Sequence, residues 1–144
     1  MKMLPLEHTI PYQSELICDS FRRSAPPHIN IYDKILDNLK RALESGSYRA
    51  WLYGDDDGSK AIAVTTIKCD EVLDRKELII VSASSLKKLS VADWKGCWDE
   101  MVKYATEMGC THVVSYTVVD KIAEMSQLMG GDPVMKYLSI PIGG

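Results

Sequence analysis

The chain has no long apolar run and no block of charge of one sign. Its 144 residues hold no apolar stretch near the roughly 20 residues that a membrane-spanning helix needs. Pro5, Glu7 and His8 interrupt the apolar residues at the N-terminus, which is atypical of a signal peptide. The 17 basic and 20 acidic residues are dispersed, so no concentrated basic face is expected for nucleic acid. These absences argue against nucleic acid and membrane as partners, and the composition favours a soluble globular protein.

Closely spaced cysteines are also absent. The four cysteines form no C-x-x-C pair, and with three dispersed histidines they give no metal-ligand spacing. Each is expected to be a small buried hydrophobe rather than a ligand or half of a disulfide. A reducing, cytoplasmic environment follows as the expectation. The cysteines are Cys18, Cys69, Cys97 and Cys110.

The N-terminal third of the chain predicts a short strand and two helices. Glu7–Tyr12 is a possible strand, and Ser14 can cap a helix that ends near Ser24, before two prolines. A second helix has Asn30 as a good N-cap and Gly46 after its last turn. Apolar residues at helical spacing give this second helix one buried face.

The apolar period then changes to two, which predicts three strands. The strands are Arg49–Tyr53, Lys60–Lys68 and Glu77–Ser84, joined by polar turns at 54–58 and 70–75. Short turns between sequential strands indicate an antiparallel meander.

A long helix follows the third strand. Apolar residues fall at helical spacing from Val91 to Met108, and Gly109 ends the helix. Ser90 and Asp93 resemble a capping box with Asp in place of the usual Glu.

The C-terminal part predicts a strand, a helix and a last strand. Thr111–Val118 is rich in β-branched residues, which is typical of a strand buried on both faces. Its connection through the long helix implies that it runs parallel to the third meander strand. Asp120 can cap a shorter helix that ends at Gly130, and Val134–Ile140 closes the chain.

This order of elements resembles the GNAT fold of the N-acetyltransferase superfamily over nearly the whole chain. The order is strand, two helices, three-strand meander, long helix, strand, helix, strand. The resemblance implies a single α/β domain over residues 1–144, with a mixed, mostly antiparallel sheet and helices on both faces.

In active members of that family, a glycine-containing loop of the type Arg/Gln-x-x-Gly-x-Gly/Ala precedes the long helix. Its backbone N–H groups hold the pyrophosphate of acetyl-CoA. Counted back from the glycine that ends the helix, this loop falls on residues 89–94 here. Leu89 takes the place of the basic or amide residue, and Ser90, Ala92 and Trp94 stand at the glycine positions. A tryptophan does not allow the close backbone approach that glycine does.

Four polar residues near this loop are the candidate cofactor-binding residues, should acetyl-CoA bind. Lys87 and Lys88 could supply charge to a phosphate at the helix N-terminus, with Ser84 and Ser90 nearby. The alternative is that the lysines are solvated loop residues and that Ser90 is a helix cap. The sequence favours this alternative, with no cofactor bound, because a lysine pair without glycines is a signal of low specificity.

The family's second marker, Asn, then Tyr, then Gly-Phe, is also altered. Asp120, Gln127 and Gly131-Asp132 stand at these positions. Glutamine cannot replace a tyrosine that gives a proton to the leaving thiolate. Catalytic residues therefore stay unknown. The other candidate tyrosines are Tyr116 and Tyr137.

Several other side chains have a structural and a functional interpretation. Trp94 and Trp98 share one face of the long helix and are expected in the core, although they could form an aromatic wall or an interface anchor. His112 is expected to be hydrogen-bonded rather than a general base. Three serines could line the cleft of a GNAT-like sheet: Ser82, Ser84 and Ser85. Four methionines are expected to fill gaps in the core: Met101, Met108, Met125 and Met129.

Three functional hypotheses remain. The first is a non-catalytic protein that binds a protein partner or its own copies. Leu89-Ser90 and Lys95 match an L-S-x-x-x-x-K segment of small GNAT-like proteins of tailed phages, some of which are virion or assembly proteins. That resemblance implies a place in the host cytoplasm or the virion. The second is an acyl-CoA-dependent N-acetyltransferase of unknown acceptor, and the third, resting on size alone, is a regulator of a host protein.

Overall fold

The computed structural model describes residues 2–5, 10–24, 31, 33–55, 58–115, 130 and 140–142. Within these residues, five strands form one sheet in the order β1-β2-β3-β4-β5. All neighbouring strands are antiparallel except β4 and β5, which are parallel. The predicted meander and parallel pair are therefore confirmed. The strands are β1 Lys2–Pro5, β2 Tyr48–Asp55, β3 Gly58–Asp70, β4 Arg75–Ser85 and β5 His112–Ser115.

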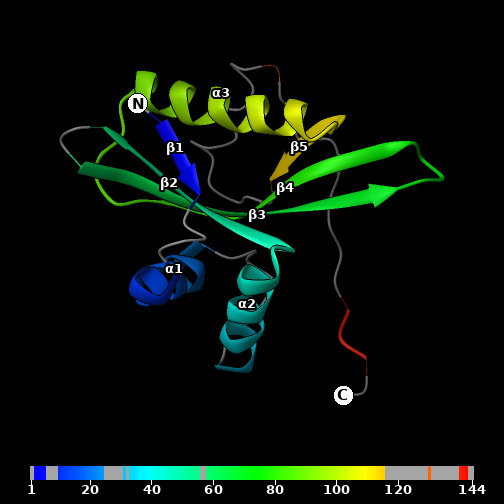
Figure 1. Ribbon diagram of the computed structural model, residues 1–144, viewed down its shortest axis with the longest axis horizontal. Helices are drawn as coiled ribbons and strands as arrows, with labels where there is room; N and C mark the ends of the chain where they lie inside the picture. Colours follow the sequence, from blue (N-terminus) through cyan, green and yellow to red (C-terminus); the bar gives the residue numbers. More distant parts are fainter. Residues whose placement is uncertain are drawn as a thin grey trace.

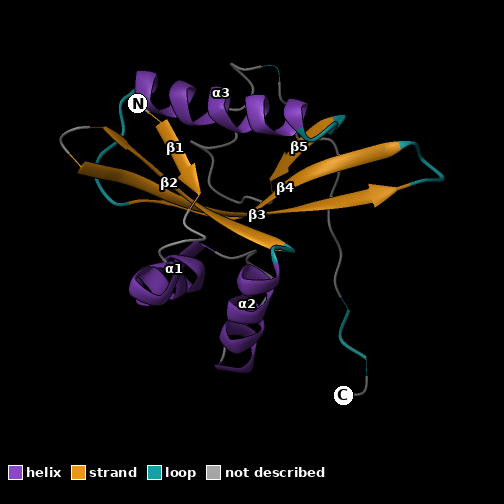
Figure 2. Ribbon diagram, in the orientation of Figure 1, coloured by secondary structure: helices purple, strands orange, loops and turns teal. Residues whose placement is uncertain are grey.

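Helices cover both faces of the sheet, as predicted (Figures 1 and 2). α1 (Ile10–Ser24) and α2 (Asp33–Ser45) lie on one face, and α3 (Val91–Glu107) lies across the other. α1 contacts β3 and β4, whereas α2 contacts β2. The result is a three-layer α/β arrangement with the long helix alone on its side among the described helices.

Each face of the sheet has its own apolar core. The core under α1 and α2 includes Ile17, Leu39 and Val64, and the core under α3 includes Leu78 and Met101. Alternation along the strands produces this division, because successive residues of a strand point to opposite faces. Each helix is thus held to the sheet by burial of one apolar stripe.

A bulge in β4 interrupts this alternation. Val64 of β3 pairs with Ser82, but Thr65 pairs with Ile80, which leaves Val81 as an extra residue. Before the bulge, Ile80 belongs to the core under α3, whereas Val81 packs against the core under α1 and α2. Ser82, opposite Val64, lies on that second side as well.

Several sequence predictions are wrong in the described residues. The predicted strand Glu7–Tyr12 is incorrect from Ile10 onward, where α1 already begins, and the N-terminal strand is Lys2–Pro5. The same apolar spacing fits a helix or a strand in so short a segment. In the predicted strand Thr111–Val118, which was expected to be buried on both faces, His112 and Ser115 are exposed. Two expected core residues, Cys69 and Met108, are also exposed, because they lie at the far end of the hairpin and after the last turn of α3.

The other outcomes concern the remaining cysteines and the C-terminal elements. All four cysteines are free; Cys18 is buried, and Cys97 and Cys110 are partly buried. The predicted short helix after Asp120 and most of the strand Val134–Ile140 lie outside the described residues. None of the three helices described above is long and apolar enough to cross a membrane.

Gly96 brings α3 close to the sheet. A Cβ atom at this position would overlap the hydroxyl oxygen of Tyr53 on β2. That hydroxyl is fully buried and has no hydrogen-bond partner within the described chain. Glycine here permits close contact between helix and sheet, at the expense of helix propensity.

We expect Gly96→Ala to destabilise the fold by about 1–3 kcal/mol, as overpacking does, although alanine is the better helix former. The cause would be the Tyr53 hydroxyl, so Tyr53→Phe should recover at least half of the loss in the double variant. Urea unfolding of the four chains measures both effects. Equal losses from Gly96→Ala in the Tyr53 and Phe backgrounds would contradict this account.

Candidate functional site

The candidate site is the junction between β4 and α3. β4 ends at Ser85, a short loop carries Lys87 and Lys88, and α3 begins at Val91 (Figure 1). The last part of β4, beyond the bulge at Val81, leads into this junction. Helix N-termini commonly present backbone N–H groups to ligands.

The backbone of the loop is hydrogen-bonded to β3. The amides of Leu86 and Lys87 both donate to the carbonyl oxygen of Lys60, at 2.7 and 3.3 Å. These two donors therefore point at the sheet and not at a ligand. An anion cradle needs successive amides that converge on one open position.

A capping box closes the N-terminus of α3, as the sequence predicts. The Ser90 hydroxyl accepts from the Asp93 amide at 3.1 Å, and the Asp93 carboxylate accepts from the Ser90 amide at 3.0 Å. Ser90 has the extended backbone of an N-cap residue. The role of Ser90 as a helix cap is thereby confirmed.

Lys60 adds a second partner for the same carboxylate. Its ammonium group lies 3.4 Å from Asp93 Oδ1, and the Asp93 side chain is only 7% exposed. The hydrogen bond from the Ser90 amide is the main cause that lowers the pKa of Asp93, and Lys60 lowers it further. Asp93 is therefore ionised at neutral pH, and it places a negative charge where the helix dipole would attract an anion.

The Tyr53 hydroxyl and the Cys97 thiol, beneath the first turns of α3, keep their protons at neutral pH. Burial raises the pKa of the Tyr53 hydroxyl, and the nearby Cys97 thiol and Asp93 carboxylate raise it further. Burial, with a further contribution from Asp93, raises the pKa of Cys97 to about 12. A thiol with that pKa holds its proton and is a poor nucleophile.

The four predicted cofactor-binding residues do not gather around one point. Lys87, Lys88 and Ser90 share the loop, and both lysine side chains are exposed. Ser84 lies on the other side of the sheet, where its hydroxyl is 2.6 Å from the hydroxyl of Ser20 on α1.

The structure places some of the remaining residues of interest in or beside the cores, and others lie outside the described residues. Trp98 packs against the core under α3, and Trp94 is half-buried in the first turns of that helix. The hydroxyl of Ser82 is buried without a described partner, whereas Ser85 is exposed. Tyr116, Asp120, Met125, Gln127, Met129, Gly131, Asp132 and Tyr137 lie outside the described residues.

His112 is hydrogen-bonded, as predicted. Its Nδ1 atom is 2.8 Å from the Thr111 hydroxyl, and its Nε2 atom is 3.3 Å from the Arg75 guanidinium. Across the described ranges, no group of three or more His, Cys, Asp or Glu side chains could hold a metal ion.

Sequence reasoning missed Lys60, Tyr53 and Gly96 at this site. Lys60 and Asp93 are 33 positions apart, so no local spacing connects them. Lys60 does stand at the start of a predicted strand that follows a tight turn. Nothing in that pattern says which helix end its side chain will reach.

We expect the contribution of Asp93 to stability to depend on pH in one direction. Its folded-state pKa is lowered, so the stabilisation is present above the unfolded-state value of about 4 and is lost as pH falls through the folded value. The wild type should unfold at higher urea concentration than Asp93→Asn at pH 7, and the gap should narrow below about pH 4. Asp99→Asn, an exposed change on α3, is the control. A gap that stays constant from pH 7 to pH 3 would contradict the assignment.

Comparisons with known proteins identify the fold. No family model and no curated protein matches the chain. One similar solved structure, described as a probable acetyltransferase, has a TM-score of 0.74 at 13% identity, covering 100% of this chain and 99% of that one. The ribosomal-protein-alanine N-acetyltransferase of Brucella melitensis biovar Abortus 2308 has a TM-score of 0.66 at 11% identity, with both chains covered completely. An aminoglycoside acetyltransferase from an uncultured soil metagenomic sample has a TM-score of 0.62 at 12% identity, covering 99% of this chain and 94% of that one. The chain therefore has the fold of the GNAT acetyltransferases along its length.

Proposed function

We propose that this protein is a non-catalytic member of the GNAT fold that acts by binding protein. The observation that carries the proposal is the Asp93 carboxylate, which takes the anion position at the start of α3. A pyrophosphate at this position would meet a buried negative charge at close range. It would also have to displace that charge from both Lys60 and the Ser90 amide.

The junction does not fit the pyrophosphate of acetyl-CoA. The amides of Leu86 and Lys87 are bonded to the Lys60 carbonyl, and the Ser90 amide is bonded to Asp93. Trp94 donates its amide to the Ser90 carbonyl at 3.0 Å, as an ordinary helical residue would. Four of the amides near the predicted phosphate position are therefore already used within the chain, so we derive no reaction through this cofactor.

A phage origin accompanies the proposal, with a role in the virion or in its assembly. It is supported by the Leu89-Ser90 and Lys95 match and by the loss of both family markers together. A protein that has kept a stable fold without its reaction can offer surfaces to partners, since function depends on sites and not on folds.

The alternative is an acyl-CoA-dependent N-acetyltransferase of unknown acceptor. One observation favours it: the amides of Val91 and Ala92 make no hydrogen bond within the described part of the chain. In that case Lys87 and Lys88 would neutralise the phosphates with Ser90 beside them, whereas Ser84 faces Ser20 on the α1 side of the sheet. A phosphate bound by these two amides would then have to lie away from the Asp93 carboxylate.

Titration calorimetry with acetyl-CoA decides between these functions. We expect no saturable heat at about 1 mM ligand and no rise in melting temperature. A ligand present at 100 times its Kd would instead stabilise the folded protein by about 2.7 kcal/mol and raise its melting temperature. Saturable binding in the micromolar range that is weakened by Lys87→Ala with Lys88→Ala would establish the alternative. Lys40→Ala with Lys34→Ala, two exposed lysines of α2, is the matched control.

The genomic setting provides a separate test of the phage role. We expect the genes beside this one to encode portal, tail or internal virion proteins. Neighbours that encode only bacterial metabolic enzymes would count against a virion role, whatever the result with acetyl-CoA.

A further inference from the structure

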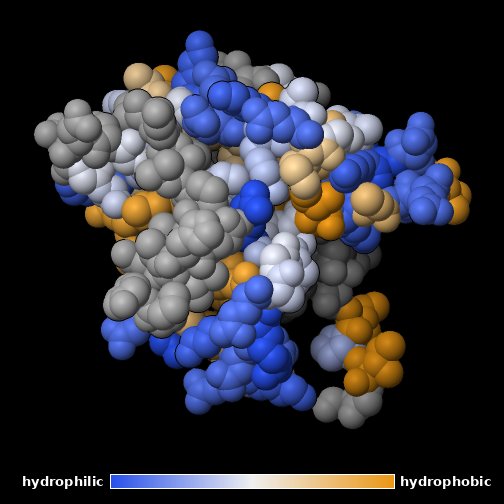
Figure 3. Space-filling view, viewed as in Figure 1, coloured by the Kyte–Doolittle hydropathy of each residue, from blue (hydrophilic) through white to orange (hydrophobic). Residues whose placement is uncertain are grey.

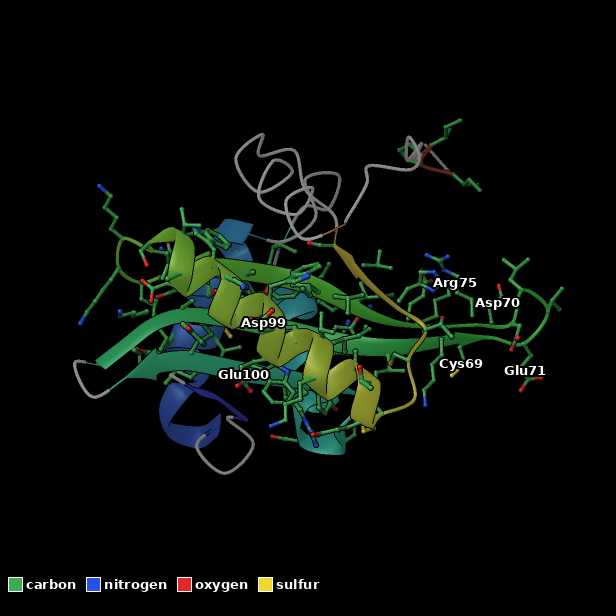
Figure 4. All side chains as sticks on the ribbon, turned by 90° about the horizontal axis from the view of Figure 1, so that it is seen from above. Cys69, Asp70, Glu71, Arg75, Asp99 and Glu100 are labelled. Atoms are coloured by element: carbon green, nitrogen blue, oxygen red, sulfur yellow. The ribbon has the colours of Figure 1, made fainter. Side chains whose placement is uncertain are left out.

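The hairpin of β3 and β4 projects beyond the rest of the sheet (Figures 1 and 4). β5 pairs with β4 only from Glu77 onward, so the last residue pairs of the hairpin extend past the edge of β5. We call residues Asp70–Asp74 the hairpin tip. Its two apolar side chains are among the most exposed in the described chain, Val72 at 93% and Leu73 at 70%.

The folding of the turn does not require these apolar residues. The Asp70 carboxylate accepts from the amides of Val72 and Leu73, both at 3.1 Å, which fixes the turn. Asp74 has a positive φ of 50°, a conformation that Asp tolerates better than most residues. Polar residues would serve at positions 72 and 73, where the side chains make no contribution to either core.

The hairpin tip is acidic around its apolar residues. Asp70, Glu71 and Asp74 are its charged residues, and Glu71 and Asp74 are exposed. Arg75, the next residue along the chain, is paired with Glu77 at 2.9 Å. Figure 3 shows apolar residues beside hydrophilic ones at this end of the molecule, and Figure 4 labels Asp70 and Glu71 there.

The opposite end of the molecule has the complementary character. Val91, the first residue of α3, is 68% exposed. Lys88 precedes it in the loop and Lys95 follows one helical turn later, both exposed. We call Lys88, Val91 and Lys95 the basic end. The start of α3 and the hairpin tip lie at opposite ends of the sheet in two perpendicular views (Figures 1 and 4).

We propose that the hairpin tip of one copy binds the basic end of a second copy. An acidic rim around Val72 and Leu73 meets a basic rim around Val91, so charge and apolar surface both match. This inference rests on the proposed function and names its partner as the chain itself. Two different surfaces meet in this contact, so it joins copies head to tail, into a ring or an open chain.

The contact is small and therefore weak for a single pair. Few residues take part on each side, so the buried area is expected to be well below the roughly 800 Å² per partner of a stable interface. Association is expected only at high protein concentration, and it should weaken as salt screens the charges.

Sedimentation velocity of the purified full-length chain tests the proposal at about 10 µM to 1 mM, a range in which weak contacts are measurable. The average mass should rise with concentration, less so at high salt. Val72→Ser with Leu73→Ser, Glu71→Lys, and Lys88→Glu should each weaken association at least about tenfold, which corresponds to about 1.4 kcal/mol. Glu44→Lys and Lys40→Glu, on α2, make the same charge changes and should leave it unaltered.

A charge exchange makes the test specific. The double variant Glu71→Lys/Lys88→Glu should associate like the wild type, because each end has reversed its sign. Unchanged melting temperatures would show that the variants fold. A wild type that is monomeric at every concentration, or tip variants that associate normally, would overturn the inference. Neither result bears on the proposal that the protein is non-catalytic, which the acetyl-CoA titration tests separately.

Discussion

The ion pair between Asp93 and Lys60 links the first turn of α3 to β3. The same carboxylate caps the helix through the Ser90 amide, so one side chain sets where α3 begins and ties it to the sheet. The Lys60 carbonyl holds the preceding loop through two amides. The loop, the helix start and the strand thus form one connected unit. Its stability and the internal use of its backbone hydrogen-bond donors have the same origin.

Much of this fold could be predicted from sequence because its signals are local. The capping box, the apolar stripe of α3 and the turn chemistry of the meander each depend on residues a few positions apart. β1 was misplaced because its identity depends on pairing with β2, far along the chain. Exposure at Cys69 and Met108 was missed for a similar reason: hydrophobicity is a property of the residue, whereas burial depends on what covers it.

The candidate site was predictable only in part. The capping role of Ser90 could be predicted from its spacing to Asp93, and the structure confirms it. The use of the loop amides could not be predicted, because backbone direction is not encoded in the identity of Leu86 or Lys87. The close approach of Gly96 to Tyr53 needs the relative position of two elements, which no spacing along the chain supplies.

The single extra residue at Val81 changes which face of the sheet the following side chains of β4 point to. Upstream of the bulge, even-numbered side chains such as Leu78 and Ile80 face α3; downstream, Ser82 and Ser84 face the α1 layer. Side chains at even-numbered positions of this one strand therefore face different layers before and after the bulge. An insertion or deletion elsewhere in the second half of β4 would exchange the two sets of side chains without altering any residue's identity. The number of residues in this part of the strand therefore determines which layer each side chain reaches.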